Sequence, residues 1–180
     1  DPQFTHYMFN TMYYNPGFAG AEGVTKFTAI HRSQWAGYEP SFGDGGAPTS
    51  QVISMTSPLN KIRSGIGAYI VNDRLGALNN LEAQVSYAYH LALKDTKLSF
   101  GLKAGMYSQT LDFDMYRYID PNDPLLKDQV GKTSQVRPDL AAGLFMQREK
   151  YYVGVSFNHL VNSTFDFGVS QRSALQPHMY

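Results

Sequence analysis

The chain has 180 residues, no net charge at pH 7 and no cysteine. Zero net charge excludes a general attraction to nucleic acid or to an anionic membrane surface. The lack of cysteine excludes disulfides, thiolate metal sites and cysteine nucleophiles. Aromatic residues make up 14% of the sequence, and glycine occupies 16 positions. These residue types favour strands and tight turns over helices, in which glycine costs about 1 kcal/mol relative to alanine.

The chain begins with Asp1 rather than Met. We interpret this residue as the mature end left by removal of a signal peptide, although an artificial boundary would look the same. We expect residues 1–24 to form an N-terminal segment that precedes the first strand. After it, the sequence predicts seven strands, at residues 26–35, 50–57, 65–72, 81–93, 97–106, 140–146 and 151–158.

The strand predicted at 97–106 has the clearest alternation. Successive side chains of a strand point to opposite faces, so residues two apart share a face. One face is wholly apolar: Leu98, Phe100, Leu102, Ala104 and Met106. The other is polar or small: Lys97, Ser99, Gly101, Lys103 and Gly105. The strand at 81–93 repeats this plan, and a short connection at Lys94–Thr96 makes the two a predicted hairpin.

A second hairpin follows the same plan around the turn at 148–150. Its first strand places on one face Leu140, Ala142, Leu144 and Met146. Its second strand places on one face Tyr151, Val153, Val155 and Phe157. The predicted strands have lengths close to the roughly 9–11 residues that a tilted membrane strand requires.

The connections between these strands alternate in length. Short turns are expected at 58–64, 94–96 and 148–150, and long connections at 36–49, 109–139 and 161–180, with an intermediate one at 73–80. Short periplasmic turns that alternate with long extracellular loops are typical of outer-membrane β-barrels. A soluble β-sandwich also has alternating strands, but its loops need not be long on one side. The pattern therefore favours an all-β fold, a transmembrane antiparallel up-and-down β-barrel.

An odd number of strands would leave the chain on the outer side of the membrane. We therefore expect Met179-Tyr180 to begin an eighth strand. On this interpretation residues 25–180 are the N-terminal half of a larger barrel, with about seven to eight strands, and its C-terminal remainder is absent. The longest nearly pure apolar stretch, Leu140–Met146, is too short for a membrane helix, which needs about 20 residues.

Three stretches resemble one family. The first runs Asp1-Pro2-Gln3-Phe4-Thr5-His6-Tyr7-Met8-Phe9-Asn10 and continues through Tyr13-Tyr14-Asn15-Pro16-Gly17-Phe18-Ala19-Gly20. The second comprises Arg32-Ser33-Gln34-Trp35-Ala36-Gly37 and Gly46-Ala47-Pro48-Thr49-Ser50-Gln51, and the third is Val153-Gly154-Val155-Ser156-Phe157-Asn158-His159-Leu160. Together they resemble the PorP/SprF family of the type IX secretion system of Bacteroidetes.

The resemblance implies an outer-membrane barrel of roughly twice this length that helps to export or anchor surface proteins, gliding adhesins among them. Other secretion-system components and outer-membrane lipid would be its further partners. Thr11-Met12 departs from the Pro-Leu-like pair expected there. The family pattern has no catalytic residues, so none are carried over.

No residue pattern indicates catalysis, a cofactor or a metal. The five histidines have no HxH or HExxH spacing: His6, His31, His90, His159 and His178. The acidic residues near 112–123 lack the central glycine of a calcium loop. Ser156 and His159 are an odd number of residues apart and are expected on opposite strand faces, so they cannot form a hydrolytic pair locally. We expect that the chain is not an enzyme.

Partner binding is the expected function. The long 109–139 connection supplies the kinds of side chain that anchor interfaces: Phe113, Met115, Tyr116, Tyr118, Leu125 and Leu126. Arg32 and Gln34 share a face that must be the lumen, because arginine does not face lipid cheaply, and Trp35 then points outward to the aromatic girdle. A lumen network is one interpretation of Arg32 and Gln34, and a direct partner contact is the other. A passive porin or hydrophobic-solute transporter, and a soluble β-sandwich binding module, remain alternatives for the whole chain.

Overall fold

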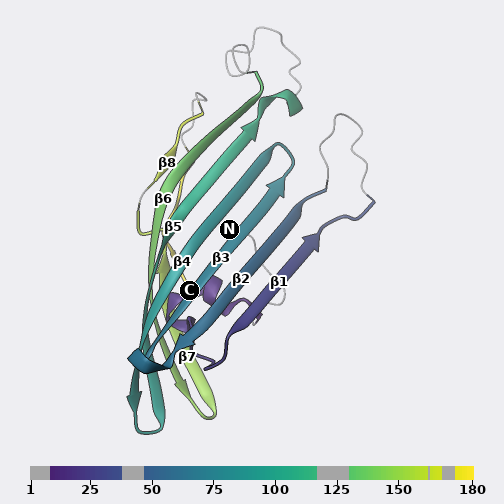
Figure 1. Cartoon of the computed structure of the whole chain (residues 1–180). Coiled ribbons are helices and arrows are strands. Elements are labelled where there is room, and N and C mark those ends of the chain that lie inside the picture. The colour runs from purple at the N-terminus through teal and green to yellow at the C-terminus, as the bar shows by residue number, and fades with distance from the viewer. Residues whose placement is uncertain (1–8, 38–46, 117–129, 162, 168–172) are drawn as a thin grey trace.

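The computed structural model describes residues 9–37, 47–116, 130–161, 163–167 and 173–180. Eight strands form one sheet in the order β1-β2-β3-β4-β5-β6-β7-β10 (Figure 1). Every pairing is antiparallel. The strands are β1 Lys26–Ser33, β2 Thr49–Leu59, β3 Ser64–Leu75, β4 Leu78–Leu93, β5 Thr96–Asp112, β6 Lys132–Arg148, β7 Tyr151–Asn158 and β10 His178–Met179. This is the up-and-down sheet of a β-barrel, and within the described ranges it is open, with β1 at one edge and β10 at the other.

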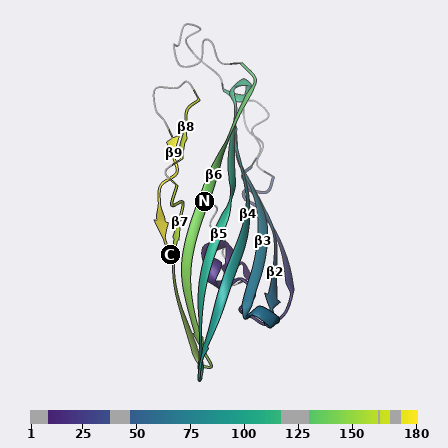
Figure 2. The ribbon, with the colours of Figure 1, turned by 60° about the vertical axis from the view of Figure 1, so that its left-hand side comes forward.

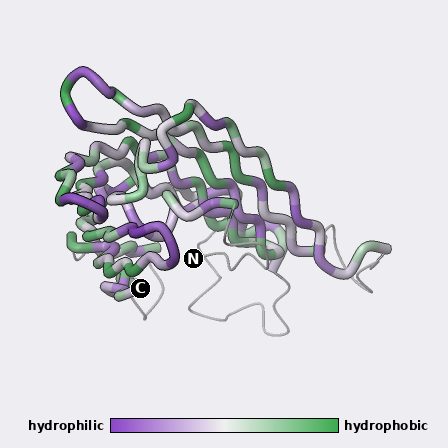
Figure 3. The backbone as a smooth tube through the Cα atoms, turned by 90° about the horizontal axis from the view of Figure 1, so that it is seen from below, coloured by the Kyte–Doolittle hydropathy of each residue, from purple (hydrophilic) through white to green (hydrophobic). Residues whose placement is uncertain are grey.

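Along each strand, side chains alternate between a convex and a concave face. On the convex face of β4 and β5, Val85 is 62% exposed and Leu102 is 67% exposed. Their neighbours on the concave face, Ser86 and Lys103, are buried. Hydropathy therefore alternates from residue to residue along the tube in Figure 3. The face assignments predicted for 81–93, 97–106, 140–146 and 151–158 agree with this arrangement.

Several strands are longer than predicted. β5 and β6 stay paired as far as Asp112 opposite Lys132, so the connection predicted at 109–139 spans only residues 113–131. The extra residues at 107–112 and 132–138 carry Ser, Gln and Thr on both faces. Apolar alternation fades there, and a search for alternation ends the strand too early.

The connection predicted at 73–80 is also shorter than expected. Leu75 pairs with Leu78, so that β3 and β4 are joined by the two-residue turn Gly76-Ala77. Gly76 has a φ of 61°, which glycine adopts without steric cost. The end of the sheet opposite the turns at 60–63, 94–95 and 149–150 thus has one tight turn as well as long connections. We call the end with these three turns the turn side and the opposite end the loop side.

The eighth strand is present where it was expected. His178 pairs with Asn158 and Met179 with Phe157, and the backbone groups of Tyr180 and Ser156 exchange two hydrogen bonds of 3.0 Å. Within the described ranges, one large sheet and the two-stranded β8-β9 pair (Thr164–Phe165 and Ser173–Ala174) are the only sheets. This arrangement is not that of a sandwich, which requires two packed sheets.

Two segments outside the main sheet cover its concave face. Residues 9–23, with the short helices α1 (Thr11–Tyr14) and η2 (Pro16–Phe18), lie inside the curve of the sheet (Figure 2). After β7, His159 has a φ of 56° and the chain turns inward, towards β8. His159 is consequently buried on the same face as Ser156, and the prediction that the two residues point to opposite faces was wrong. Among the described residues, no helix is long and apolar enough to cross a bilayer.

Candidate functional site in the concave face

A row of small residues crosses five strands on the concave face near the turn side. Its members lie directly opposite one another in the register. They are Gly65 of β3, Ala88 of β4, Gly101 of β5, Gly143 of β6 and Ser156 of β7. We call this set the small-residue row. Because no large side chain rises from it, another stretch of backbone can lie directly on the sheet.

Residues 14–20 occupy that space. A Cβ atom placed on Gly65 would lie 2.0 Å from the carbonyl oxygen of Ala19, and one on Gly101 would lie 2.1 Å from the backbone nitrogen of Gly17. At Gly143 the added carbon would be 2.3 Å from Oδ1 of Asn15. The N-terminal segment therefore crosses the strands at backbone contact distance, and the row must stay small for it to fit.

Hydrogen bonds fix the segment to several strands. Asn15 donates from Nδ2 to the carbonyl oxygen of Leu144 at 2.9 Å, and Ser156 donates to the carbonyl oxygen of Tyr14 at 2.7 Å. At the other end of the segment, the Gly20 amide donates to Thr56 at 2.6 Å. These contacts reach β2, β6 and β7, so the segment ties together distant strands of the sheet.

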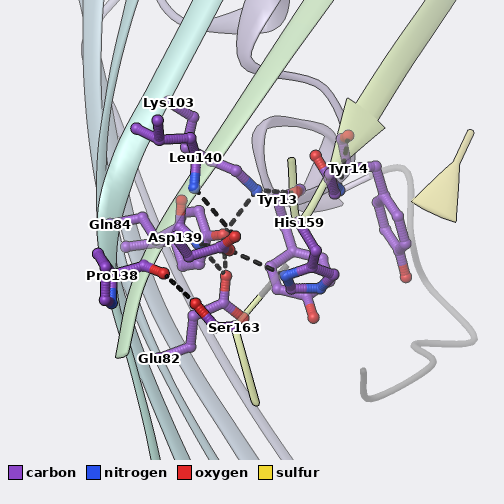
Figure 4. Close-up of polar contacts among 12 residues, drawn as sticks. Tyr13, Tyr14, Glu82, Gln84, Lys103, Pro138, Asp139, Leu140, His159 and Ser163 are labelled. Atoms are coloured by element: carbon purple, nitrogen blue, oxygen red, sulfur yellow. Dashed lines mark hydrogen bonds and ion pairs between the residues drawn. The ribbon is translucent and has the colours of Figure 1, made fainter. Parts of the chain in front are cut away.

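A buried polar network lies beside this segment, in the middle of the concave face (Figure 4). Lys103 donates from Nζ to the Tyr13 carbonyl at 3.0 Å and to the Tyr69 hydroxyl at 2.7 Å. Tyr69 in turn donates to Glu82 at 2.5 Å. A buried ammonium group is costly unless it is hydrogen-bonded and faces opposite charge, and this chain of contacts supplies both.

The network continues to the strand end of β7. The Gln84 amide donates to Glu82 Oε1 and to Asp139 Oδ2, both at 2.7 Å. His159 Nδ1 lies 2.9 Å from the same Asp139 oxygen. One ammonium, two carboxylates and an imidazole thus join β3, β4, β5, β6 and the end of β7. This arrangement holds strands and segments in place.

The arrangement does not form a nucleophile–base pair. Ser156 is used in its bond to Tyr14, and His159 lies against Asp139. Burial raises the pKa of the Tyr13 hydroxyl well above its ordinary value, with the Glu82 carboxylate adding to the effect. Tyr13 therefore stays neutral at physiological pH. No group of three or more His, Asp or Glu side chains in the described part of the chain could hold a metal ion.

The loop-side half of the concave face is filled by aromatic rings. Tyr107, Phe113, Phe165 and Phe167 form one buried cluster, and Tyr107 and Phe165 have ring centroids 5.9 Å apart. Phe165 is brought over the sheet by the inward turn at His159, and Arg137 donates from Nε to the neighbouring Thr164 carbonyl at 2.9 Å. We call these four rings the aromatic cluster.

The predicted partner-binding residues are placed differently from one another. Phe113 is only 5% exposed and belongs to the aromatic cluster, while Tyr116 is 45% exposed and Met115 is half-buried. Tyr118, Leu125 and Leu126 lie outside the described residues.

At the other long connection, Arg32 and Gln34 are half-buried on the concave side, as expected, and Trp35 is 69% exposed. The Gln34 amide oxygen, in the orientation that satisfies both groups, accepts from Nη2 of Arg32 at 2.8 Å. This contact agrees with a lumen network. The structure brings Arg32 and Gln34 together and keeps them on β1 and its extension, away from β5 and η4 (Phe113–Met115) in the sheet order.

Sequence reasoning missed the small-residue row and the polar network. Glycine at an inward strand position was a signal for the row, because glycine weakens a strand unless a close approach requires it. Lys103 was a signal for the network, since an inward lysine needs partners. Neither signal names the partner residue, which depends on pairing between strands far apart in sequence.

The fold and this concave face define a class of protein. A single up-and-down sheet, apolar on its convex face and filled with polar and aromatic contacts on its concave face, is characteristic of membrane β-barrels. The chain belongs to the family described as type IX secretion system membrane protein PorP/SprF, whose model matches residues 1–180. Comparison with curated proteins gave no match, and comparison with solved structures gave none either.

Proposed function

We propose that this chain is part of an outer-membrane barrel that holds an exported surface protein, such as a gliding adhesin, at its loop side. Membership of the family supports a place among the membrane components of type IX secretion. The proposal assigns no catalytic activity to the chain. Its specific content is the direction of the barrel and the surface that contacts the exported protein.

Membrane placement is supported by the convex face. Large apolar side chains cover it, and an extensive exposed apolar surface marks contact with lipid or protein. A cysteine placed at Leu102 should resist a water-soluble thiol reagent more than one at Lys97, which lies on the opposite face of β5 and is only half-buried. Leu102→Arg should cost about 2–4 kcal/mol near the bilayer midplane. Equal labelling at both positions would contradict the assignment of the faces.

The proposed orientation places the turn side in the periplasm and the loop side outside the cell. Long connections on one side and tight turns on the other are the basis for this choice. Epitope tags inserted at Asp95 or Glu149 should be unreachable on whole cells. Tags near Ser41 or Asn122, which lie outside the described residues, should be accessible. The reverse accessibility would overturn the orientation and leave the barrel itself standing.

The observation that carries the binding proposal is the exposed apolar surface at the loop side. Trp35 is 69% exposed, Val130 is 85% exposed and Tyr116 is 45% exposed. All three lie beyond the ends of β1, β5 and β6, above the alternating apolar band of the convex face. Aromatic residues in such positions are common anchors of protein interfaces. Phe113 supports this surface from below rather than forming part of it.

The filled concave face favours partner binding over passive conduction. Residues 9–23 and the segment after β7 lie where an open channel would need water, and both are held by hydrogen bonds and ring contacts. A porin or solute transporter built on this part of the sheet would have to displace them. Binding at the loop side requires no such movement.

Purification of the complex tests the proposal. Trp35→Ser, Tyr116→Ser and Val130→Ser together should reduce the exported protein that co-purifies in detergent by about tenfold or more, since each lost anchor commonly costs about 1–2 kcal/mol. The matched control changes Tyr151 and Tyr152 to Ser, because these side chains are equally exposed but lie at the turn side. The control should retain the exported protein.

Two outcomes would replace the proposal. If the triple variant co-purifies with as much exported protein as the unchanged chain, the loop-side surface does not bind that protein. Loss of small-solute uptake, with retention of every co-purifying protein, would establish the transporter instead.

A further inference from the structure

The turn side of the sheet has an excess of positive charge. Its three turns and their flanking residues carry six basic and two acidic side chains. The basic ones are Lys61, Arg63, Lys94, Lys97, Arg148 and Lys150, and the acidic ones are Asp95 and Glu149. The rest of the chain balances this charge, since the net charge of the whole is zero. The excess is therefore local to one end of the molecule.

Part of this charge surrounds a cavity of about 730 Å³. Its basic lining residues are Arg63, Lys94, Lys97 and Arg148, and its acidic ones are Asp95 and Glu149. Gly20, Ser64 and His90 line it from the concave side. We call this space the basic turn cavity. Its size falls within the range of about 300–1,000 Å³ typical of ligand sites.

Two of the four cations have neither an acidic partner nor a hydrogen bond from their charged groups among the described residues. Arg148 lies 3.9 Å from Asp95, and Lys97 donates to the Ala21 carbonyl at 2.9 Å. In the part of the chain that the structure describes, neither Arg63 nor Lys94 forms an ion pair. Both are exposed, so their charges are available to a ligand in the cavity.

The backbone at these two residues adds a second observation. Arg63 has a φ of 51° and Lys94 a φ of 47°, in the left-handed region that favours glycine. A side chain costs about 1–2 kcal/mol there relative to glycine. Two tight turns thus carry long cationic side chains where glycine would be less strained. Strain of this kind often accompanies a binding role.

We propose that the basic turn cavity binds an extended acidic segment of another protein on the turn side. Carboxylates of such a segment would pair with Arg63 and Lys94 and lie near Arg148. The cavity opens between the turns and the concave face, whereas lipid would cover the convex face, so its position suits a protein segment better than a lipid headgroup. Residues 14–20 cover the concave face beyond the cavity, which confines the segment to the turn side.

The proposed orientation would place this cavity in the periplasm, so the inference rests on the proposed function for its location only. The occupant would then be a periplasmic protein, or a periplasmic part of the secretion machinery, rather than the exported protein held at the loop side. The two surfaces lie at opposite ends of the strands.

A labelled hexaglutamate peptide can test the proposal by fluorescence anisotropy with the purified full chain in a neutral detergent. The peptide should bind, and a hexaglutamine peptide should not. Arg63→Gln with Lys94→Gln should weaken binding about tenfold, because each removes one charge-assisted contact. Raised salt should weaken it further. The exchange Arg63→Lys with Lys94→Arg should preserve most of the binding.

Lys61→Gln with Lys150→Gln is the matched control. It removes the same charge from the turn side, but neither residue lines the cavity. It should change the affinity less than about twofold. Equal weakening by both pairs would show diffuse attraction and overturn the proposal, as would the absence of hexaglutamate binding.

A vesicle arm separates protein from lipid. The chain reconstituted in phosphatidylglycerol bilayers should still bind the peptide, and less tightly after the Arg63 and Lys94 changes. If phosphatidylglycerol abolishes peptide binding in the unchanged protein, a lipid headgroup is the occupant and the proposal fails. The triple variant of Trp35, Tyr116 and Val130 should bind the peptide normally, so failure here is distinguishable from failure of the proposed function.

Discussion

The two halves of the concave face are filled in opposite ways. On the turn side, residues 14–20 cross the small-residue row so closely that backbone meets backbone at Gly65 and Gly101. On the loop side, the four rings of the aromatic cluster fill the space, and Phe165 is only 1% exposed. The turn-side half requires small residues in the sheet, whereas the loop-side half requires large aromatic side chains.

This contrast has a simple energetic meaning. A close backbone contact is sensitive to any added carbon, because the segment above it cannot move without losing hydrogen bonds. An aromatic cluster is sensitive to removed atoms, because each lost ring leaves a cavity and exposes apolar surface. Additions should therefore harm the turn side, and truncations the loop side.

The largest expected effect is from Phe165→Ala. Truncation of a buried phenylalanine costs about 3–5 kcal/mol, and here it removes the ring that holds residues 163–167 over Tyr107. Limited proteolysis should then cut this segment much faster. Phe157→Ala, on the convex face and half exposed, should leave the segment protected. Equal protection in both variants would contradict the account of the loop-side half.

Lys103→Met tests the boundary between the two halves. Loss of the ammonium group removes its hydrogen bonds to the Tyr13 carbonyl and the Tyr69 hydroxyl. It also removes the positive charge on β5 that compensates the Glu82 carboxylate. Hydrogen bonds to charged groups contribute about 1.5–3 kcal/mol, so the midpoint of thermal unfolding in detergent should fall clearly. Lys132→Met, an exposed lysine beside Asp112, should barely change it. A similar midpoint for both variants would show that the network adds no stability.

Gly101→Val addresses the small-residue row directly. Its Cβ would lie 2.1 Å from the Gly17 nitrogen, and overpacking of this kind costs about 1–3 kcal/mol. Residues 9–23 should leave the sheet and become accessible to protease. Ala142→Val should have no such effect, because Ala142 lies on the convex face of the neighbouring strand β6. Continued protection of the segment in Gly101→Val would contradict the close backbone contact between Gly101 and Gly17.

The smallest expected effect comes from Asn15→Ala, which removes the bond to Leu144 and the bond from the Gly17 amide and costs about 1–2 kcal/mol. It offers the sharpest test of contact. Gly143→Ala alone should also destabilise, because its Cβ would lie 2.3 Å from the Asn15 amide oxygen. The two changes together should cost less than their sum, because the alanine removes that oxygen. Strict additivity in this double-mutant cycle would refute the contact.

The convex face was predictable because its signal is local. Leu98, Phe100 and Leu102 repeat every second residue, and the apolar face of each strand can be assigned without knowing its neighbours. The same local signal failed at the loop side, where β5 and β6 run beyond the apolar band. The two-residue turn at Gly76 was missed because polar residues on both sides of it resemble a longer connection.

The concave face was not predictable in the same way, because its contacts run across the strands. Gly65, Gly101 and Ser156 lie in one row across the sheet only if every intervening turn has the right length. The sequence pattern predicts a three-residue turn at Lys94–Thr96, whereas Leu93 pairs with Thr96. A shift of one residue moves a whole strand face. The inward turn at His159, which brings Phe165 to Tyr107, has no glycine to signal it.

The small-residue row also sets an order of events during folding. Tyr14 and Ser156, which meet across it, are 142 residues apart in the chain. Contacts of such separation form late, since the entropy of closing so long a loop must first be offset by the strands between them. The surface of the sheet that Asn15 contacts is complete only after β6 and β7 have paired. Residues 9–23 are therefore among the last to reach their place, although they are synthesised before every strand that they cover.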